Sequence, residues 1–132
     1  MITALYASLL ALLMMWLAVQ VIKQRRINKV AHGDGNGNES IEALQIVRSA
    51  QGNAVDSIPI TLIMLALLEL NGANLFIIHG LGIVFLVGRV VHGKAILKRD
   101  LKGRVMGMKL TFATMFALVV LNLLYLPFDK MW

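Results

Sequence analysis

Two pairs of polar residues in the middle of the chain have a spacing that suits a binding site. Asn53 and Asp56 are three residues apart, and so are Arg89 and His92. Residues at i and i+3 share one face of a helix, so each pair faces one way if its segment is helical. Two antiparallel helices could aim both pairs into one polar pocket.

The same residues allow a purely structural interpretation. Both pairs lie next to apolar stretches, where an ionisable group needs a partner even near the end of a membrane helix. Asp56 and Arg89 could form an internal salt bridge, with Asn53 and His92 as polar groups at the helix interface. The residue pattern leaves both alternatives open.

The composition excludes several kinds of chemistry. The chain has no cysteine among its 132 residues, so disulfides, cysteine-bound zinc and a protein thiol nucleophile are excluded. His79 and His92 are separated by about 20 Å along a helix, too far to share a metal ion, so we expect no metal site and a helix-packing role for His79. The net charge of +6 lies in short loops without aromatic residues, which favours lipid headgroups over nucleic acid as the partner.

Hydropathy predicts how these residues are positioned. The chain is 58% hydrophobic with a mean hydropathy of +0.75, above the roughly 45–50% of a soluble domain. Long uncharged stretches can each cross a hydrocarbon layer of about 30 Å. We therefore predict an all-α membrane protein, a single four-helix domain in the lipid bilayer. Its helices are expected at about 1–24, 39–71, 74–97 and 104–128.

The second predicted helix is the longest and carries the first polar pair. Asn38 is a possible cap, and the turn signature from Asn71 to Asn74 makes this helix an antiparallel neighbour of the third. Pro59 leaves the carbonyl of Val55 without its partner amide, so a kink is expected there.

Loop charges predict the orientation in the membrane. Twelve of the 13 Lys and Arg residues flank the first and third connections, and Lys130 alone lies on the other side. By the positive-inside rule both loops are cytoplasmic and both termini are outside. In a bacterium this is a multi-pass protein of the inner membrane.

Two segments resemble motifs of a known family. The run Ala50-Gln-Gly-Asn-Ala-Val-Asp-Ser-Ile-Pro59 resembles the helix-two motif of the MAPEG family, the membrane-associated proteins in eicosanoid and glutathione metabolism. Gly88-Arg-Val-Val-His92 resembles the helix-three motif of its prostaglandin E synthases and bacterial members. Weaker matches are Arg104 with Gly107 and the basic run from Lys23 to Lys29. These matches occur in the same order as in the family and span nearly the whole chain.

The resemblance implies a homotrimer whose glutathione sites lie between subunits near the cytoplasmic face. It implies glutathione as co-substrate, held by several basic residues, an amide, an acid and an imidazole. By resemblance the cofactor-binding residues are Arg25, Arg48, Asn53, Asp56, Arg89, His92 and Arg104. Arg104 and Arg89 are the candidate catalytic residues, since a guanidinium near the thiol would favour the thiolate.

Three positions depart from the family pattern. The family's Arg four residues before the Asn is Ser49 here, and Arg48 is one residue earlier. A Tyr four residues after the His is Ile96, and the thiol-activating Arg of the synthases falls around Val105 rather than Arg104. Catalysis is therefore less strongly implied than binding.

The sequence thus predicts a membrane-bound glutathione transferase or peroxidase that acts on lipophilic electrophiles entering from the bilayer. The alternative is a non-catalytic protein that binds a lipid or a partner on the same scaffold, which Ser49 and Ile96 favour. A transporter or channel is less favoured, because His79 is the one ionisable residue near the middle of a predicted span.

Overall fold

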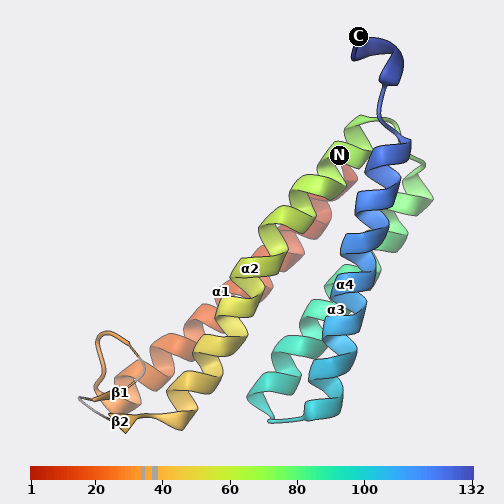
Figure 1. Ribbon diagram of the computed structural model, residues 1–132. Coiled ribbons are helices and arrows are strands. Elements are labelled where there is room, and N and C mark those ends of the chain that lie inside the picture. The colour runs from red at the N-terminus through yellow and green to blue at the C-terminus, as the bar shows by residue number, and fades with distance from the viewer. Residues whose placement is uncertain (34, 37–38) are drawn as a thin grey trace.

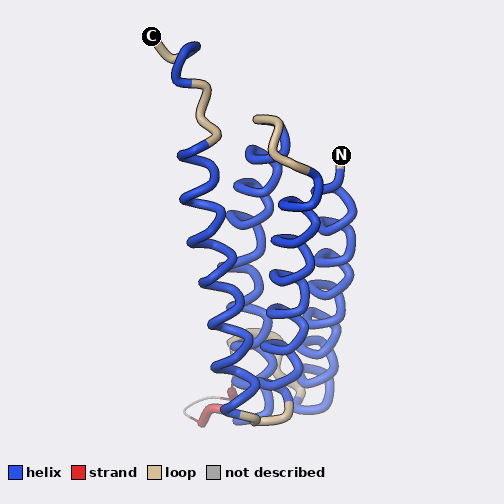
Figure 2. Tube along the Cα trace, turned by 90° about the vertical axis from the view of Figure 1, so that its right-hand side faces the viewer, coloured by secondary structure: helices blue, strands red, loops and turns tan. Residues whose placement is uncertain are grey.

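The computed structural model is a bundle of four long helices, described for all residues except 34 and 37–38. Each helix is long and apolar enough to cross a membrane, which confirms the predicted all-α membrane fold. The helices are α1 (Ile2–Asn28), α2 (Glu42–Leu70), α3 (Leu75–Leu97) and α4 (Leu101–Leu124). The remaining elements are the short antiparallel pair β1 (Gly35–Asn36) and β2 (Glu39–Ser40) and a single 3-10 turn, η1 (Phe128–Lys130). Figure 2 shows the four helices running alongside one another.

The helix ends differ from the prediction for local reasons. Because residues 39–40 pair with 35–36 in the β ladder, α2 begins at Glu42 and not at 39. The expected cap, Asn38, lies outside the described residues. Helix α4 begins at Leu101 because the Asp100 side chain accepts a hydrogen bond from the Lys102 amide at 3.1 Å. It ends at Leu124, since Pro127 disfavours helical backbone in the residue before it.

Helix α2 is continuous through Pro59. Two hydroxyl groups on either side of the proline bond back to the helix backbone. Ser57 donates to the Asn53 carbonyl at 2.9 Å and Thr61 donates to the Ser57 carbonyl at 2.7 Å. Such bonds satisfy both hydroxyl groups within the apolar part of the helix.

Opposite the basic loops, contacts between helices tie the bundle together where α2 turns into α3. The Glu69 carboxylate at the end of α2 accepts hydrogen bonds from the first amides of α1, those of Ile2 and Thr3, and from the Thr3 hydroxyl. The Tyr6 hydroxyl lies 2.8 Å from His79 Nδ1 and joins α1 to α3. This contact confirms the helix-packing role expected of His79.

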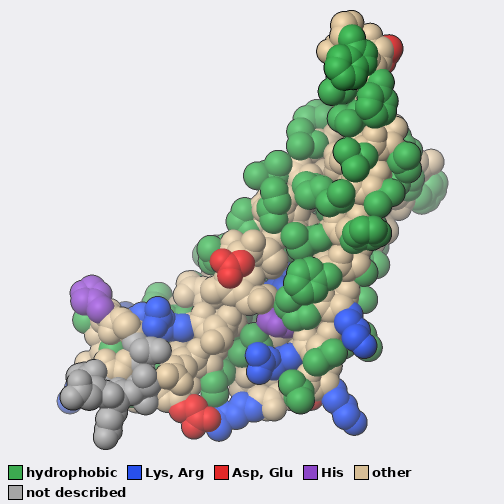
Figure 3. Space-filling view, viewed as in Figure 1, with side chains coloured by type: hydrophobic (Ala, Val, Ile, Leu, Met, Phe, Trp, Pro, Cys, Tyr) green, Lys and Arg blue, Asp and Glu red, His purple; other side chains and the backbone are tan. Residues whose placement is uncertain are grey.

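The helices associate as two pairs, α1 with α2 and α3 with α4, which diverge away from the α2–α3 turn (Figure 1). Lys and Arg side chains gather where the pairs diverge, around the α1–α2 and α3–α4 connections, and we call this the basic end (Figure 3). Arg99 and Glu42 form an exposed ion pair at 3.1 Å there. The opposite end is covered mainly by hydrophobic side chains in this view.

Candidate functional site

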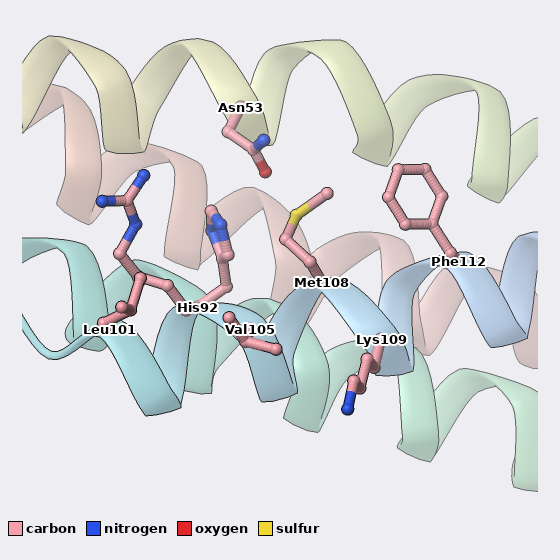
Figure 4. A pocket seen from close by; sticks show the side chains of 8 residues that line it. Asn53, His92, Leu101, Val105, Met108, Lys109 and Phe112 are labelled. Atoms are coloured by element: carbon pink, nitrogen blue, oxygen red, sulfur yellow. The ribbon is translucent and has the colours of Figure 1, made fainter.

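A pocket of about 600 Å³ lies between α2, α3 and α4, in the half of the bundle nearer the basic end (Figure 4). We call it the interhelical pocket. Its lining consists of Asn53 from α2, His92 from α3, and Leu101, Arg104, Val105, Met108, Lys109 and Phe112 from α4. The pocket therefore contains polar groups from all three helices, and its apolar wall is formed by α4 alone.

The close approach of α4 to α3 fixes one side of this pocket. A Cβ built on Gly107 would lie 2.5 Å from Cβ of His92 and 2.8 Å from the Gly88 carbonyl oxygen. A Cβ on Gly88 would lie 2.8 Å from that of Leu110. Only glycine allows the two backbones to approach this closely, as at small-residue interfaces of other membrane helices. The two glycines therefore hold His92 against α4.

Arg89 lies behind His92 and is almost fully buried, with 1% of its surface exposed. Its guanidinium donates hydrogen bonds to Thr111 Oγ1 and to His92 Nδ1, both at 3.3 Å. The Thr111 hydroxyl in turn donates to the Gly107 carbonyl at 2.9 Å. Arg89 Nε has no partner among the described residues. Arg89 thus joins His92 to Thr111 on α4 and does not itself line the pocket.

This contact determines which nitrogen of His92 carries the proton. A guanidinium can only donate, so Nδ1 of His92 must accept, and the neutral imidazole then carries its proton on Nε2. Figure 4 shows the imidazole projecting from α3 toward Asn53 on α2. His92 therefore offers a ligand an N–H donor.

Asn53 provides the complementary group. Its Oδ1 is buried and has no hydrogen-bond partner among the described residues. A buried carbonyl oxygen without a donor is uncommon in native structures and needs an explanation. In Figure 4 this oxygen is directed into the pocket, toward His92 and Met108. A ligand N–H would satisfy it.

A second pocket of about 370 Å³ adjoins the first and shares Leu101 and Arg104 with it. Its other lining residues are Glu42, Gln45, Ile46, Ser49, Ile96 and Arg99. Ser49 and Ile96, two of the departures from the family motifs, thus face one cavity beside Arg104. Where the family pattern has an Arg and a Tyr, this chain has a small hydroxyl and an aliphatic side chain.

The structure brings together part of the predicted set of site residues. Asn53, His92 and Arg104 line one pocket, with Arg89 behind them. Arg104 reaches it although Val105, beside it in the lining, is the position where the family pattern has its Arg.

Three predicted residues lie elsewhere in the chain. Asp56 is exposed and forms no ion pair with any described residue, so the alternative of an Asp56–Arg89 salt bridge is wrong. Arg48 is exposed and lines neither of these two pockets. Arg25 donates to the Gly33 carbonyl at 2.9 Å, at the end of α1.

Sequence reasoning missed the apolar wall of the pocket and Lys109. Leu101, Val105, Met108 and Phe112 recur at intervals of three or four, which is one stripe along a helix. That spacing is visible in the sequence, but three of these four side chains are exposed in the structure. The stripe reads equally well as a lipid-facing surface.

The fold and site define a multi-pass helical membrane protein with a polar pocket that is open along one apolar wall. The MAPEG family model matches residues 3–124, and the chain belongs to this family. It is 38% identical over 129 residues to the inner membrane protein YecN of Escherichia coli K12, covering 98% of this chain and 95% of YecN. YecN of Escherichia coli O6:H1 matches with the same identity and coverage.

Proposed function

We propose that the chain is a glutathione-dependent transferase or peroxidase that acts on lipophilic electrophiles. One observation carries the proposal: a pocket with Asn53, His92 and Arg104 at its polar side continues along the apolar side chains Val105, Met108 and Phe112. A water-soluble thiol and an apolar substrate need such a divided site if they are to meet.

The polar side has groups that suit glutathione. The tripeptide offers amide N–H groups to Asn53 Oδ1, and its carbonyl or carboxylate oxygens suit the Nε2–H donor of His92. The Arg104 guanidinium suits a carboxylate or the thiolate. Each of these pairings leaves the protein group satisfied, and the acceptor on Asn53 has no other partner among the described residues.

The homotrimer belongs to this proposal. Asp56 is exposed on α2, and Arg25 and Arg48 lie outside the pocket. If a neighbouring protomer packed against α2, glutathione bound between the two protomers could place its ammonium group beside Asp56. The neighbouring protomer would also supply cations for the carboxylates of glutathione. A site shared between protomers thus accounts for the family-motif residues that one protomer leaves apart.

The chemical step would begin with the glutathione thiolate. A thiol with a pKa of ~8.5 is ~3% ionised at pH 7, and a nearby guanidinium that lowers this pKa to ~6.5 would raise that fraction to ~75%. In conjugation the thiolate sulfur attacks the electrophilic carbon and a halide leaves. In peroxide reduction it attacks the terminal hydroperoxide oxygen and the O–O bond breaks, which gives glutathione sulfenic acid and an alkoxide that takes a proton to become the alcohol. A second glutathione then displaces water from the sulfenic acid and forms glutathione disulfide.

The location of the site follows from the charge asymmetry. With the basic end in the cytoplasm, as the positive-inside rule requires, the pocket opens where glutathione is abundant in bacteria that make it, and its apolar wall extends into the bilayer. YecN is an inner membrane protein, which supports the same membrane for this chain.

Turnover assays test the proposal. The purified protein in detergent is assayed with glutathione and either a chlorinated nitrobenzene or a lipid hydroperoxide. We expect turnover that Arg104→Ala abolishes and Lys102→Ala leaves intact, since Lys102 is an exposed cation at the start of α4 that does not line the pocket. No turnover with any electrophile, in protein that binds glutathione, would leave the second candidate.

That candidate is a non-catalytic lipid- or partner-binding protein on the same scaffold. Ser49 and Ile96 favour it, because these two positions of the cavity beside Arg104 lack the Arg and the Tyr of the family pattern. Binding of a lipid or of glutathione in the interhelical pocket without turnover is the result that this candidate predicts.

A further inference from the structure

A groove of about 380 Å³ lies between α1 and α3, separate from the interhelical pocket, with which it shares no residue. We call it the α1/α3 groove. It is lined by Leu9, Leu12, Leu13 and Trp16 from α1 and by Leu86, Val90 and Lys94 from α3. Six of the seven residues are apolar, and the seventh is a lysine in the last turn of α3.

The groove has the length of one membrane leaflet. Helices α1 and α3 run in the same direction, and the contact between Tyr6 and His79 sets their relative level. The lining residues of α3 run from Leu86 to Lys94, which is eight residues or about 12 Å at ~1.5 Å per residue. Half of a hydrocarbon core is about 15 Å thick. Lys94 thus marks the end of the groove at the headgroup level of the leaflet at the basic end.

The charged residues of α1 and α3 near this end have one sign. Lys94 is exposed, and its ammonium group makes no ion pair or hydrogen bond with a described residue. The stripe on α1 continues from Trp16 to Lys23, two turns further, and that on α3 continues from Lys94 to Lys98, one turn further. Both lysines are exposed, and neither α1 nor α3 contains an Asp or Glu.

A second groove of similar size lacks the combination of an apolar lining and a cation. It lies between α3 and α4, has a volume of about 390 Å³, and contains no charged residue. Its lining is Ile77, Gly80, Leu81, Val84, Ala113, Thr114 and Leu121. An acyl chain could lie in either groove, but only the α1/α3 groove provides a cation for the headgroup.

We propose that the α1/α3 groove binds an anionic phospholipid of the leaflet at the basic end. One acyl chain lies along the leucines and Trp16, and Lys94 binds the phosphate, with Lys98 one turn further along the chain. The site is independent of the glutathione site and does not rest on the proposed function. A basic residue near an anionic headgroup strengthens its binding by about fivefold.

Trp16 gives a direct measurement, because it lines the groove and Trp132 is the only other tryptophan in the chain. The Trp132→Phe protein is reconstituted into phosphatidylcholine vesicles that contain increasing mole fractions of brominated phosphatidylglycerol or of brominated phosphatidylcholine. Bromine on the acyl chain quenches indole fluorescence on contact. We expect the anionic lipid to quench Trp16 at a severalfold lower mole fraction than the neutral one.

Two further variants are made in the Trp132→Phe protein. Lys94→Gln should reduce the preference for phosphatidylglycerol about fivefold, and Lys102→Gln, which removes an exposed charge from α4 at the same end, should leave it unchanged. Equal quenching by the two lipids, or equal losses in the two variants, would overturn the proposal. Absence of quenching by both lipids would also overturn it, because another protein surface would then cover the groove.

Discussion

The guanidinium of Arg89 donates a hydrogen bond to Nδ1 of His92 at 3.3 Å, one turn further along α3. A buried cation thereby holds the imidazole with its proton on Nε2, the nitrogen available to a ligand. Thr111 on α4 fixes the same guanidinium from the other side, also at 3.3 Å. The site residue on α3 is thus oriented by a contact made across the α3–α4 interface.

The proton position on His92 can be observed directly. With Arg89 in place, nitrogen NMR of histidine-labelled protein should show the Nε2–H form for His92. Arg89→Leu should abolish that preference, because nothing then donates to Nδ1. The chain has three histidines, so His32→Gln and His79→Gln assign the remaining signal. A His92 signal from the Nδ1–H form in the unaltered protein would contradict the contact.

Gly107 should tolerate no side chain. A Cβ there would lie 2.5 Å from that of His92, so Gly107→Ala must move α4 away from α3. We expect a loss of about 1–3 kcal/mol, typical of overpacking, and weaker glutathione binding. Gly80→Ala is the matched control, since nothing lies within 4 Å of a Cβ at that position. Thermal unfolding in detergent should show Gly80→Ala to be neutral or stabilising.

Glu69 should stabilise the bundle at the end away from the site. Its carboxylate accepts from two amides and a hydroxyl at the start of α1, which otherwise has no side-chain cap. Glu69→Ala should cost about 1–2 kcal/mol, as loss of a helix cap does. Asp129→Ala removes an exposed carboxylate near the same end and should have little effect. Equal melting temperatures for the two variants would show that the cap contributes nothing.

Phe112 should affect the lipophilic substrate and not glutathione. It lies on the apolar wall of the pocket, furthest along α4 from Arg104. Phe112→Ala should raise KM for a lipid hydroperoxide severalfold, because an aromatic contact surface is lost, and should leave the affinity for glutathione unchanged. Phe116→Ala, also exposed on α4 but outside the pocket, is the control. A parallel loss of glutathione affinity in Phe112→Ala would show that glutathione also contacts the apolar wall, which contradicts the division of the pocket.

Hydropathy and the motifs predict the four helices and the convergence of Asn53, His92 and Arg104, because helix periodicity and antiparallel topology are local properties. The hydrogen-bond partner of Arg89 on α4 is distant in the sequence. The sequence suggests Asp56 on α2, yet α2 diverges from α3 here, and the glycines at 88 and 107 bring Thr111 on α4 within reach instead. The predicted start of α2 is three residues early because the β ladder involves backbone groups alone, which the residue types do not indicate.

The pocket wall on α4 has the same explanation. Met108 and Phe112 cannot be distinguished from lipid-facing residues until the rotation of α4 is known, and the contact at Gly107 sets that rotation. Asn53 and His92 are conspicuous in the sequence because polar residues are costly in a membrane. Apolar residues carry no such signal.

Titration of glutathione into the detergent-solubilised protein, followed by the ultraviolet absorbance of the thiolate, tests the central claim most directly. The account predicts saturable growth of thiolate absorbance near neutral pH, lost in Arg104→Ala and retained in Lys102→Ala. Absence of any thiolate signal in the unaltered protein, or an equal signal in Arg104→Ala, would contradict the assignment of the interhelical pocket as a glutathione-activating site.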